Sequence, residues 1–424
     1  MVEGQDVLRH AQILVSNGRI AAVRQAGAAK QPIDGHPEVI DAEDALVMPG
    51  LINAHTHTAM TLFRGFADDL PLKQWLFEKI FPAESRYLNP DTVYWGALLG
   101  CLEMIASGTT CIIDGYFFQE HAMRAVYESG LRGLMAQGVI DFPAPGVPDP
   151  KENLNAAKRF IEQGQSYKDR ITAGVFCHSP VTCSEETLRS AWETSRQLGL
   201  PLQIHLSETS EEVYEIVGKK GKRPVHYLDD LGLIDKGLIA AHGVHVEASE
   251  IACLAEKNVG VVHVPESNMK LGCGAAPVSE MVKSGIRPGL GTDGCCSNND
   301  LDLFREMDAA AKLSKVIHHD PLSLNAWSVL KMATVWGAGL LGWEHEIGTI
   351  EPGKKADIIV IDLQRPHLCP LYEPVSALVY SANGADVRDV IVDGKILMKD
   401  RAFLTLDQEE VMARVTEFSR KIRV

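Results

Sequence analysis

The 424-residue sequence predicts an α/β protein made of a (β/α)8 TIM barrel and a small β-sandwich domain formed by both ends of the chain. Two observations carry this prediction. Eight short apolar runs alternate with segments of helical periodicity, and strand pairs with tight-turn signals lie near both ends. Strands that alternate with helices form a parallel sheet, and eight such units in sequence favour closure into a barrel. A doubly wound open sheet is the alternative.

Each of the eight runs ends on a histidine or an aspartate. In a barrel the C-terminal strand ends form the active-site face, so these polar residues should converge in one cup. An open sheet would leave that coincidence unexplained. In chain order the runs cover residues 45–55, 109–114, 133–141, 171–178, 201–205, 238–242, 259–263 and 286–293.

The two flanks carry the signals of antiparallel strand pairs. Residues 12–23 surround Asn17-Gly18, and residues 387–397 turn at Asp393-Gly394, both strong hairpin signals. Residues 353–362 resemble a further strand. We expect the two ends to pair into one small domain, and four prolines between residues 141 and 150 predict a long loop after the third barrel strand. The predicted bounds are 1–48 and 354–424 for the small domain and 49–353 for the barrel.

Composition excludes several function classes. The chain has 41 Lys and Arg against 56 Asp and Glu, a net charge of −15, which disfavours a phosphate-backbone grip on nucleic acid. Nine scattered cysteines without a C-x-x-C pair indicate a reducing compartment. We find neither a secretory signal in the first twenty residues nor an apolar stretch of the ~18 residues that a membrane span needs. A cytoplasmic protein without a membrane or nucleic-acid partner is expected.

Four of the strand-end residues suit a divalent metal. His55 and His57 alternate along an extended segment, so both imidazoles point into the barrel mouth. His205 and Asp293 end the fifth and eighth runs and complete a set of three histidines and one aspartate, typical of zinc or iron sites. Each residue alone is a weak signal, but the set is strong. A metal held there would lower the pKa of a water molecule toward ~7.

Two further residues are candidates for proton transfer. Glu208, three residues after His205, would lie beside the metal without binding it and could shuttle protons. The alternative is an ordinary first-turn glutamate of the next helix. His242 ends the sixth run and could orient the attacking water. A satisfied core histidine is its alternative, because His245 and His263 also lie near strand ends.

Together these motifs resemble the amidohydrolase superfamily, and within it the 5-methylthioadenosine/S-adenosylhomocysteine deaminase family. The resemblance covers essentially the whole chain. It implies a TIM barrel with one catalytic metal, a β-sandwich from both termini and a homo-oligomer. Zinc is the expected metal, with iron(II) and manganese(II) as alternatives, and the fourth run has no lysine that could bridge a second one. The motifs are residues 48–57, 205–208, 241–244, 265–271 and 291–294.

The resemblance also implies the substrate and its contacts. Trp75 would pack over a bound nucleoside and Glu84 would accept hydrogen bonds from the ribose hydroxyls. His178 matches a substrate-contacting histidine, and Ser297 a serine near the base. The expected reaction is hydrolytic deamination of a 5′-substituted adenosine to its inosine analogue and ammonia. Glu208 would protonate N1, His242 would hold the water, and Asp293 would act as ligand and base.

Three departures from the family pattern bear on the substrate. Gln137 replaces an arginine that faces the carboxylate of S-adenosylhomocysteine, and Val181 replaces a tyrosine. Little chain precedes the turn of residues 4–7, where the family has its first strand, which predicts a late start codon or a missing edge strand. Rival substrates are 6-amino-6-deoxyfutalosine, guanine or a pterin, and a chlorinated triazine. A catalytically silent structural protein would require gaps in the ligand set, and all four ligands are present.

Overall fold

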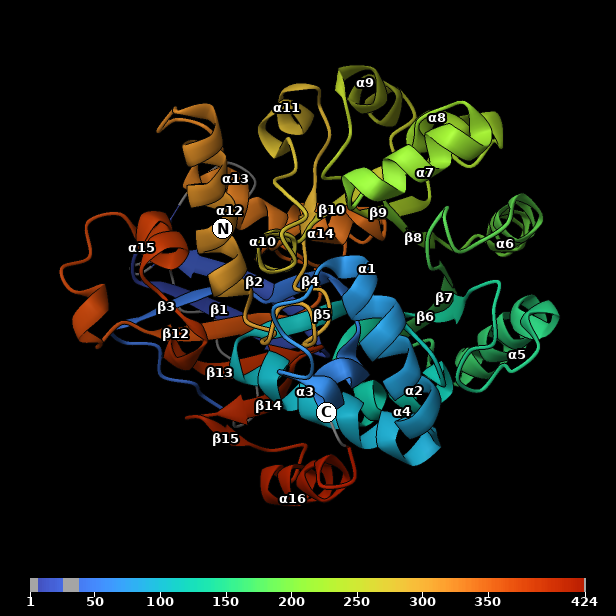
Figure 1. Cartoon of the computed structure of the whole chain (residues 1–424). Helices are drawn as coiled ribbons and strands as arrows, with labels where there is room; N and C mark the ends of the chain where they lie inside the picture. Colours follow the sequence, from blue (N-terminus) through green and yellow to red (C-terminus); the bar gives the residue numbers. More distant parts are fainter. Residues whose placement is uncertain (1–6, 26–37, 423–424) are drawn as a thin grey trace.

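The structure is a computed structural model that describes residues 7–25 and 38–422 (Figure 1). The expected turn at residues 4–7 lies mostly outside the described residues. The described chain contains a central parallel sheet surrounded by helices, with a smaller antiparallel sheet on one side.

Eight parallel strands form the central sheet, each paired with its sequence neighbour. The sheet closes because Thr56 at the end of the first strand forms a parallel bridge with Asp293, and the Asp293 N–H donates to His55 O at 2.9 Å. The predicted barrel is therefore confirmed, and the open-sheet alternative is wrong. The strands are β4 (Leu51–Thr56), β5 (Thr109–Tyr116), β6 (Arg132–Val139), β7 (Ile171–Cys177), β8 (Leu202–Leu206), β9 (Leu238–His242), β10 (Gly260–His263) and β11 (Gly289–Leu290).

Helices cover the outside of the barrel and follow the strands in sequence. Local signals set their ends: α6 begins after Ser184, whose side chain accepts from the Thr187 N–H, and ends at Gly199 in the left-handed region. The helices are α3 (Pro90–Ala106), α4 (Gln119–Ser129), α5 (Asn153–Gly164), α6 (Glu185–Leu198), α7 (Ser210–Lys220), α8 (Pro224–Asp230), α9 (Ala248–Glu256), α10 (Pro265–Lys270), α11 (Val278–Lys283), α12 (Leu303–His318), α13 (Ala326–Met332) and α14 (Val335–Leu340).

The segment between β4 and α3 lies over the C-terminal mouth of the barrel, where Figure 1 shows α1 and α2 in front of the strands. A buried 3-10 helix follows His57 directly and packs against α3. This segment therefore carries its side chains toward the strand ends. Its elements are η1 (Thr58–Phe63), α1 (Leu72–Gln74), η2 (Trp75–Ile80) and α2 (Phe81–Tyr87).

The two ends of the chain pair as predicted. One five-stranded antiparallel sheet has the order β15-β14-β13-β12-β3, so a strand from before the barrel lies beside strands from after it. The hairpin of β1 and β2 is a separate two-stranded sheet, and its Ile20 N–H donates to Lys354 O at 2.8 Å, shortly before β12. The strands are β1 (Ala11–Ser16), β2 (Arg19–Gln25), β3 (Ala45–Pro49), β12 (Ile358–Asp362), β13 (Val387–Val392), β14 (Lys395–Lys399) and β15 (Ala402–Phe403).

The two hairpin turns follow the chemistry of their residues. Asn17 and Gly18 both have positive φ, 51° and 76°, as do Asp393 and Gly394, 53° and 74°. Two successive positive φ values are the type I′ geometry that Asn-Gly and Asp-Gly favour. Beyond the strands, α15 (Pro374–Tyr380) packs on α12 and α13, and α16 (Gln408–Ser419) packs on α3. In the described part of the chain, no helix has the length and apolar character that crossing a membrane requires.

A buried ion pair links the barrel to the antiparallel sheet. Arg132 begins β6, and its Nε donates to Asp357 Oδ2 at 2.7 Å while Nη2 reaches Oδ1 at 3.2 Å. Asp357 directly precedes β12, and its Oδ1 also accepts from the Asp393 N–H at 2.7 Å. Both partners are buried, so each neutralises a charge that water does not solvate.

Replacing Arg132 with leucine should therefore be strongly destabilising, because the Asp357 carboxylate stays buried without its cation. We expect a loss of about 3–5 kcal/mol, measured as a lower midpoint of urea unfolding. Lys312→Ala removes an exposed pair with Asp308 and should cost less than about 1 kcal/mol. Equal midpoints for the two variants would contradict a stabilising role for the buried pair.

Candidate active site

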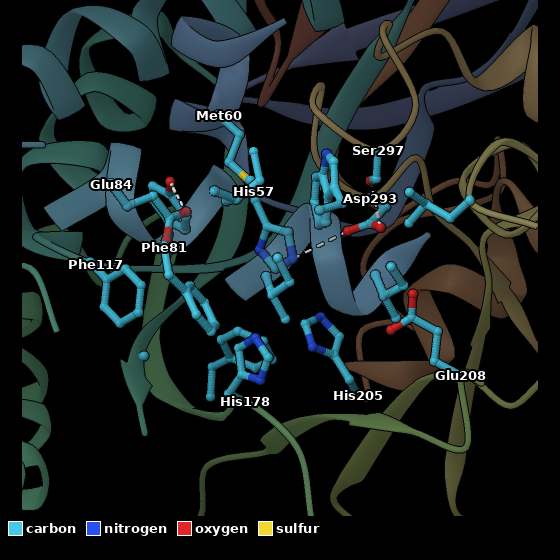
Figure 2. Close-up of a pocket in the computed structure, with 18 of the residues that line it drawn as sticks. His57, Met60, Phe81, Glu84, Phe117, His178, His205, Glu208, Asp293 and Ser297 are labelled. Carbon is cyan, nitrogen blue, oxygen red and sulfur yellow. Dashed lines mark hydrogen bonds and ion pairs between the residues drawn. The ribbon is translucent and has the colours of Figure 1, made fainter. Parts of the chain in front are cut away.

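A cavity lies at the C-terminal ends of the barrel strands (Figure 2). One end is polar and is formed by strand-end residues, while the rest is mostly apolar and comes from the segment over the mouth and from β5 to β7. The polar lining consists of His57, Glu84, Tyr116, His178, His205, Glu208, His242, Asp293 and Ser297. The apolar lining includes Met60, Leu72, Trp75, Leu76, Ile80, Phe81, Phe117, Val139, Phe176 and Leu271.

The four expected metal ligands meet at the polar end. The candidate ligand atoms of His55, His57, His205 and Asp293 all lie within 4.8 Å of one another. Asp293 Oδ1 is 3.5 Å from His55 Nε2 and 3.2 Å from His57 Nε2, and the Nε2 atoms of His55 and His205 are 3.2 Å apart. All four side chains are buried. Buried imidazole nitrogens at this distance from one another and from a carboxylate could all bind one cation, as the ligands of a metal site do.

The protonation states of His55, His205 and Asp293 also fit a metal. Burial lowers the pKa of His55 to about 4, and burial with the adjacent imidazoles holds the pKa of His205 well below its usual range. Burial opposes ionisation of Asp293, but hydrogen bonds from His55 and His57 keep the pKa of its carboxyl well below the ordinary value. Neutral imidazoles and an ionised carboxylate are the forms that coordinate a metal ion. Burial opposes the charged form of His57, but the hydrogen bond with Asp293 raises its pKa, so this imidazole would give up a proton when a metal binds.

Neighbouring groups orient these ligands. The backbone carbonyl of Gly115 lies 2.5 Å from His57 Nδ1, which leaves Nε2 as the ligand atom. Asp293 Oδ2 accepts hydrogen bonds of 2.7 Å from both Ser267 Oγ and Ser297 Oγ, so Oδ1 is left to face the imidazoles. Asp293 itself adopts a left-handed conformation with a φ of 62°. Such conformations persist where the surrounding structure fixes them, and they cluster at functional sites.

Glu208 and His242 lie together beside the four ligands. His242 Nε2 is 3.7 Å from Glu208 Oε2, and its Nδ1 is 2.9 Å from Asn268 Oδ1. Burial raises the pKa of Glu208, which favours the protonated carboxyl. His242 lines the cavity, whereas His245 Nε2 is bonded to Cys273 O at 2.8 Å. The geometry thus favours His242 over its neighbour for a role in the cavity.

The expected substrate-contacting residues also line the cavity. Figure 2 shows Glu84 and Glu208 on opposite sides of the imidazoles of His57 and His205. Tyr116 donates a hydrogen bond of 2.5 Å to Glu84 Oε1, and burial raises the pKa of the Glu84 carboxyl to about 7. Trp75 also lines the cavity, and its Nε1 is buried without a partner among the described residues.

Comparison with known proteins identifies the family. A model of the amidohydrolase family matches residues 46–397. The chain belongs to the amidohydrolase family. It is 44% identical over 411 residues to the 5-methylthioadenosine/S-adenosylhomocysteine deaminase 1 of Syntrophus aciditrophicus. The aligned residues cover 97% of this amidohydrolase and 92% of the relative. It is 45% identical over 418 residues to the 5′-deoxyadenosine deaminase of Methanosarcina mazei, covering 98% and 94% of the two chains.

Solved structures of similar fold agree with this family. An adenosine deaminase of Xanthomonas campestris with bound zinc superposes with a TM-score of 0.92, at 36% identity over 99% of this amidohydrolase and 95% of that chain. The atrazine chlorohydrolase of Arthrobacter aurescens superposes with a TM-score of 0.90 over 99% and 97% of the chains. At 21% identity, that second likeness concerns the fold alone.

Sequence reasoning missed three polar residues of this amidohydrolase site. Ser267 and Asn268 belong to the motif of residues 265–271, yet the motif gave no reason to assign them contacts with Asp293 and His242. Tyr116 ends β5 two residues after Asp114, so its strand-end position was the available signal. Three predicted strand-end residues lie outside both the ligand set and the cavity lining: Asp114 accepts from the Thr58 N–H, Asp141 accepts from Thr187 Oγ1 near the start of α6, and His263 is buried at the end of β10.

Proposed function

We propose that this amidohydrolase removes the exocyclic amine of adenine from a 5′-substituted adenosine, giving the inosine analogue and ammonia. One observation carries the proposal. At one end of the cavity the candidate metal ligands lie beside Glu208, and at the other end, across the imidazoles, lies a second buried carboxyl group, Glu84. The end with the metal ligands suits the attack of water on the adenine ring, and the Glu84 end suits hydrogen bonds from the vicinal ribose hydroxyls. The names of the relatives from Syntrophus aciditrophicus and Methanosarcina mazei agree with this reaction.

We assign His55, His57, His205 and Asp293 as the ligands of one divalent metal, with zinc as the native ion. Three imidazoles and one carboxylate suit zinc, iron and manganese, and the Xanthomonas campestris relative holds zinc. When bound, such a metal supplies a water activated for attack near neutral pH.

The residues of this chain then move the protons. Burial raises the pKa of Glu208 and favours its protonated carboxyl, which donates to N1 of the adenine ring as water oxygen bonds to C6. Asp293, which Ser267 and Ser297 hold in place, takes one proton of the water and delivers it to the amine that leaves as ammonia. The other water proton returns to the Glu208 carboxylate as the C6 carbonyl forms. His242, fixed by Asn268, orients the water.

The ribose contact predicts a loss of binding in a Glu84→Ala variant. We expect kcat/KM for 5′-methylthioadenosine to fall about 10- to 100-fold, the effect of losing hydrogen bonds to a charged group. Glu78→Ala, an exposed acid nearby, serves as the control. Because the pKa of Glu84 is raised to about 7 by burial, binding should strengthen as pH rises through 7, and Glu84→Gln should remove this dependence. Unchanged kcat/KM in Glu84→Ala would contradict the sugar contact.

The 5′ substituent should be apolar. The Gln137 amide is buried and engaged by the Gln119 N–H and Gly138 O, while Phe117 and Val139 line the cavity beside it. No lysine or arginine is among the described residues that line the cavity. A zwitterionic amino-acid tail would therefore lose hydration without gaining a cationic partner.

Specificity constants for ammonia release test this assignment. The panel is 5′-methylthioadenosine, 5′-deoxyadenosine, adenosine, S-adenosylhomocysteine, 6-amino-6-deoxyfutalosine and guanine. We expect the first two to be preferred, with S-adenosylhomocysteine weak. Equal turnover of S-adenosylhomocysteine would contradict the apolar 5′ site. Turnover of guanine alone would contradict the nucleoside assignment.

We further propose a cytoplasmic homo-oligomer without a nucleic-acid partner, divided into a small domain (1–48 and 354–424) and a barrel (49–353). All nine cysteines are free thiols, which is typical of a reducing compartment. The net charge of −15 supports the absence of a nucleic-acid partner. The homo-oligomer follows from family resemblance.

A further inference from the structure

Behind Glu208 lies a second carboxyl group that the proposed chemistry does not use. Glu212 belongs to the first turn of α7, and its Oε2 accepts a hydrogen bond of 2.8 Å from the backbone N–H of Glu208. Its Oε1 is shielded from solvent without a hydrogen-bond donor among the residues that the structure describes. The carboxyl group is therefore turned inward, toward the backbone of the proposed proton donor.

The backbone at Glu208 needs such a contact. The chain leaves β8 at Leu206 and bends through Ser207, which adopts a left-handed φ of 52°. This conformation is unfavourable for a residue with a Cβ atom and persists where neighbouring groups impose it. On one side Ser207 O accepts from the His245 N–H at 2.9 Å. On the other side the Glu208 N–H is held by Glu212.

Ordinary helix capping does not account for this contact. Thr209 is the N-cap of α7, and its side chain accepts from the Glu212 N–H at 3.1 Å. In a capping box the acid would return to the N–H of the N-cap residue itself. The start of α9 shows that arrangement, since Glu250 accepts from the N–H of its N-cap Glu247 at 3.1 Å. In α7 the acid reaches one residue further, to Glu208.

We propose that Glu212 is a positioning residue that holds the backbone of Glu208 so that its carboxyl faces the substrate. The inference rests on the proposed function, in which Glu208 donates the proton. What matters is the reach of the Glu212 side chain and its acceptor oxygen. Its charge is secondary, because burial raises the pKa of Glu212 to about 7 and leaves a neutral form well populated near neutrality.

Two substitutions separate reach from charge. Glu212→Gln keeps the length and an acceptor oxygen, whereas Glu212→Asp keeps the charge but is one methylene too short to hold the Glu208 N–H. We expect the aspartate variant to lose about 10- to 100-fold in kcat at unchanged KM and zinc content, as displaced reacting groups do. The glutamine variant should stay near wild type. Glu211→Ala, an exposed acid in the same helix turn, is the control.

Measuring the effect of Glu212→Asp on kcat in a Glu208→Gln protein shows whether Glu212 acts through Glu208. We expect Glu212→Asp to add nothing there, because residues that act as a unit are not additive. If Glu212→Asp lowered kcat in the Glu208→Gln protein by the same factor as in the wild type, the proposal would be overturned. An active Glu212→Asp variant beside an inactive Glu212→Gln variant would also overturn it.

Amide hydrogen exchange separates this proposal from the proposed function. Even if the wild type deaminates no nucleoside, the Glu208 amide should exchange slowly in the wild type and in Glu212→Gln, and faster in Glu212→Asp. Equal exchange in all three proteins would overturn the positioning role.

Discussion

Replacing Glu208 with glutamine is expected to lower kcat for 5′-methylthioadenosine by about 10²–10⁴-fold, the usual contribution of a positioned proton donor. The side chain keeps its size but loses the acidic proton that N1 must receive. Burial raises the pKa of the native Glu208 carboxyl, which favours the protonated form that donates to N1. The measurement is steady-state ammonia release by protein with a verified metal content.

Metal content decides how the Glu208→Gln result is understood. Glu208 is not among the four residues whose ligand atoms converge, so the variant should retain one zinc per chain. Glu211→Gln makes the same chemical change on an exposed side chain of α7 and should leave turnover unchanged. Near-wild-type turnover by a fully loaded Glu208→Gln protein would refute its role as proton donor.

Removal of the Asp293 carboxylate should have a still larger effect. Asp293→Ala eliminates the anionic ligand and the proposed base together, so we expect loss of bound zinc and activity at background. Ser267→Ala removes only one of the two hydrogen bonds to Asp293 Oδ2. It should weaken zinc affinity by about 10- to 100-fold, as loss of groups that orient a ligand does.

Both variants are compared by zinc content after dialysis and by ammonia release. If Asp293→Ala retained one tightly bound zinc, the assigned ligand set would be wrong. If Ser267→Ala bound zinc as tightly as the wild type, the seryl contact would have no part in orienting Asp293.

The barrel and the convergence of the four candidate ligands could be predicted because their signals are local. Each strand is a short apolar run, and barrel topology alone brings the C-terminal ends together. The alternation of His55 and His57 fixes their common direction, and the ends of β8 and β11 place His205 and Asp293 beside them. Turn chemistry likewise predicted the hairpins at Asn17-Gly18 and Asp393-Gly394.

The remaining site contacts depend on how distant segments pack. Tyr116 reaches Glu84 only because residues 58–87 lie over the barrel mouth, and nothing in the sequence periodicity predicts that position. Ser267 and Asn268 contact Asp293 and His242 because α10 follows β10 closely. Glu212 looks like an ordinary first-turn acid in the sequence, and its hydrogen bond to the Glu208 N–H follows from the bend at Ser207. The packing of α16 on α3 also joins segments far apart in the chain.

Zinc titration of the metal-free protein tests the central claim most directly, with ammonia release from 5′-methylthioadenosine as the readout. The claim is that one metal, held by His55, His57, His205 and Asp293, supports deamination of a nucleoside. We predict no activity without metal, a linear rise with added zinc, and saturation at one equivalent per chain. Full activity in the metal-free protein, or no ammonia release at one bound equivalent, would contradict the account.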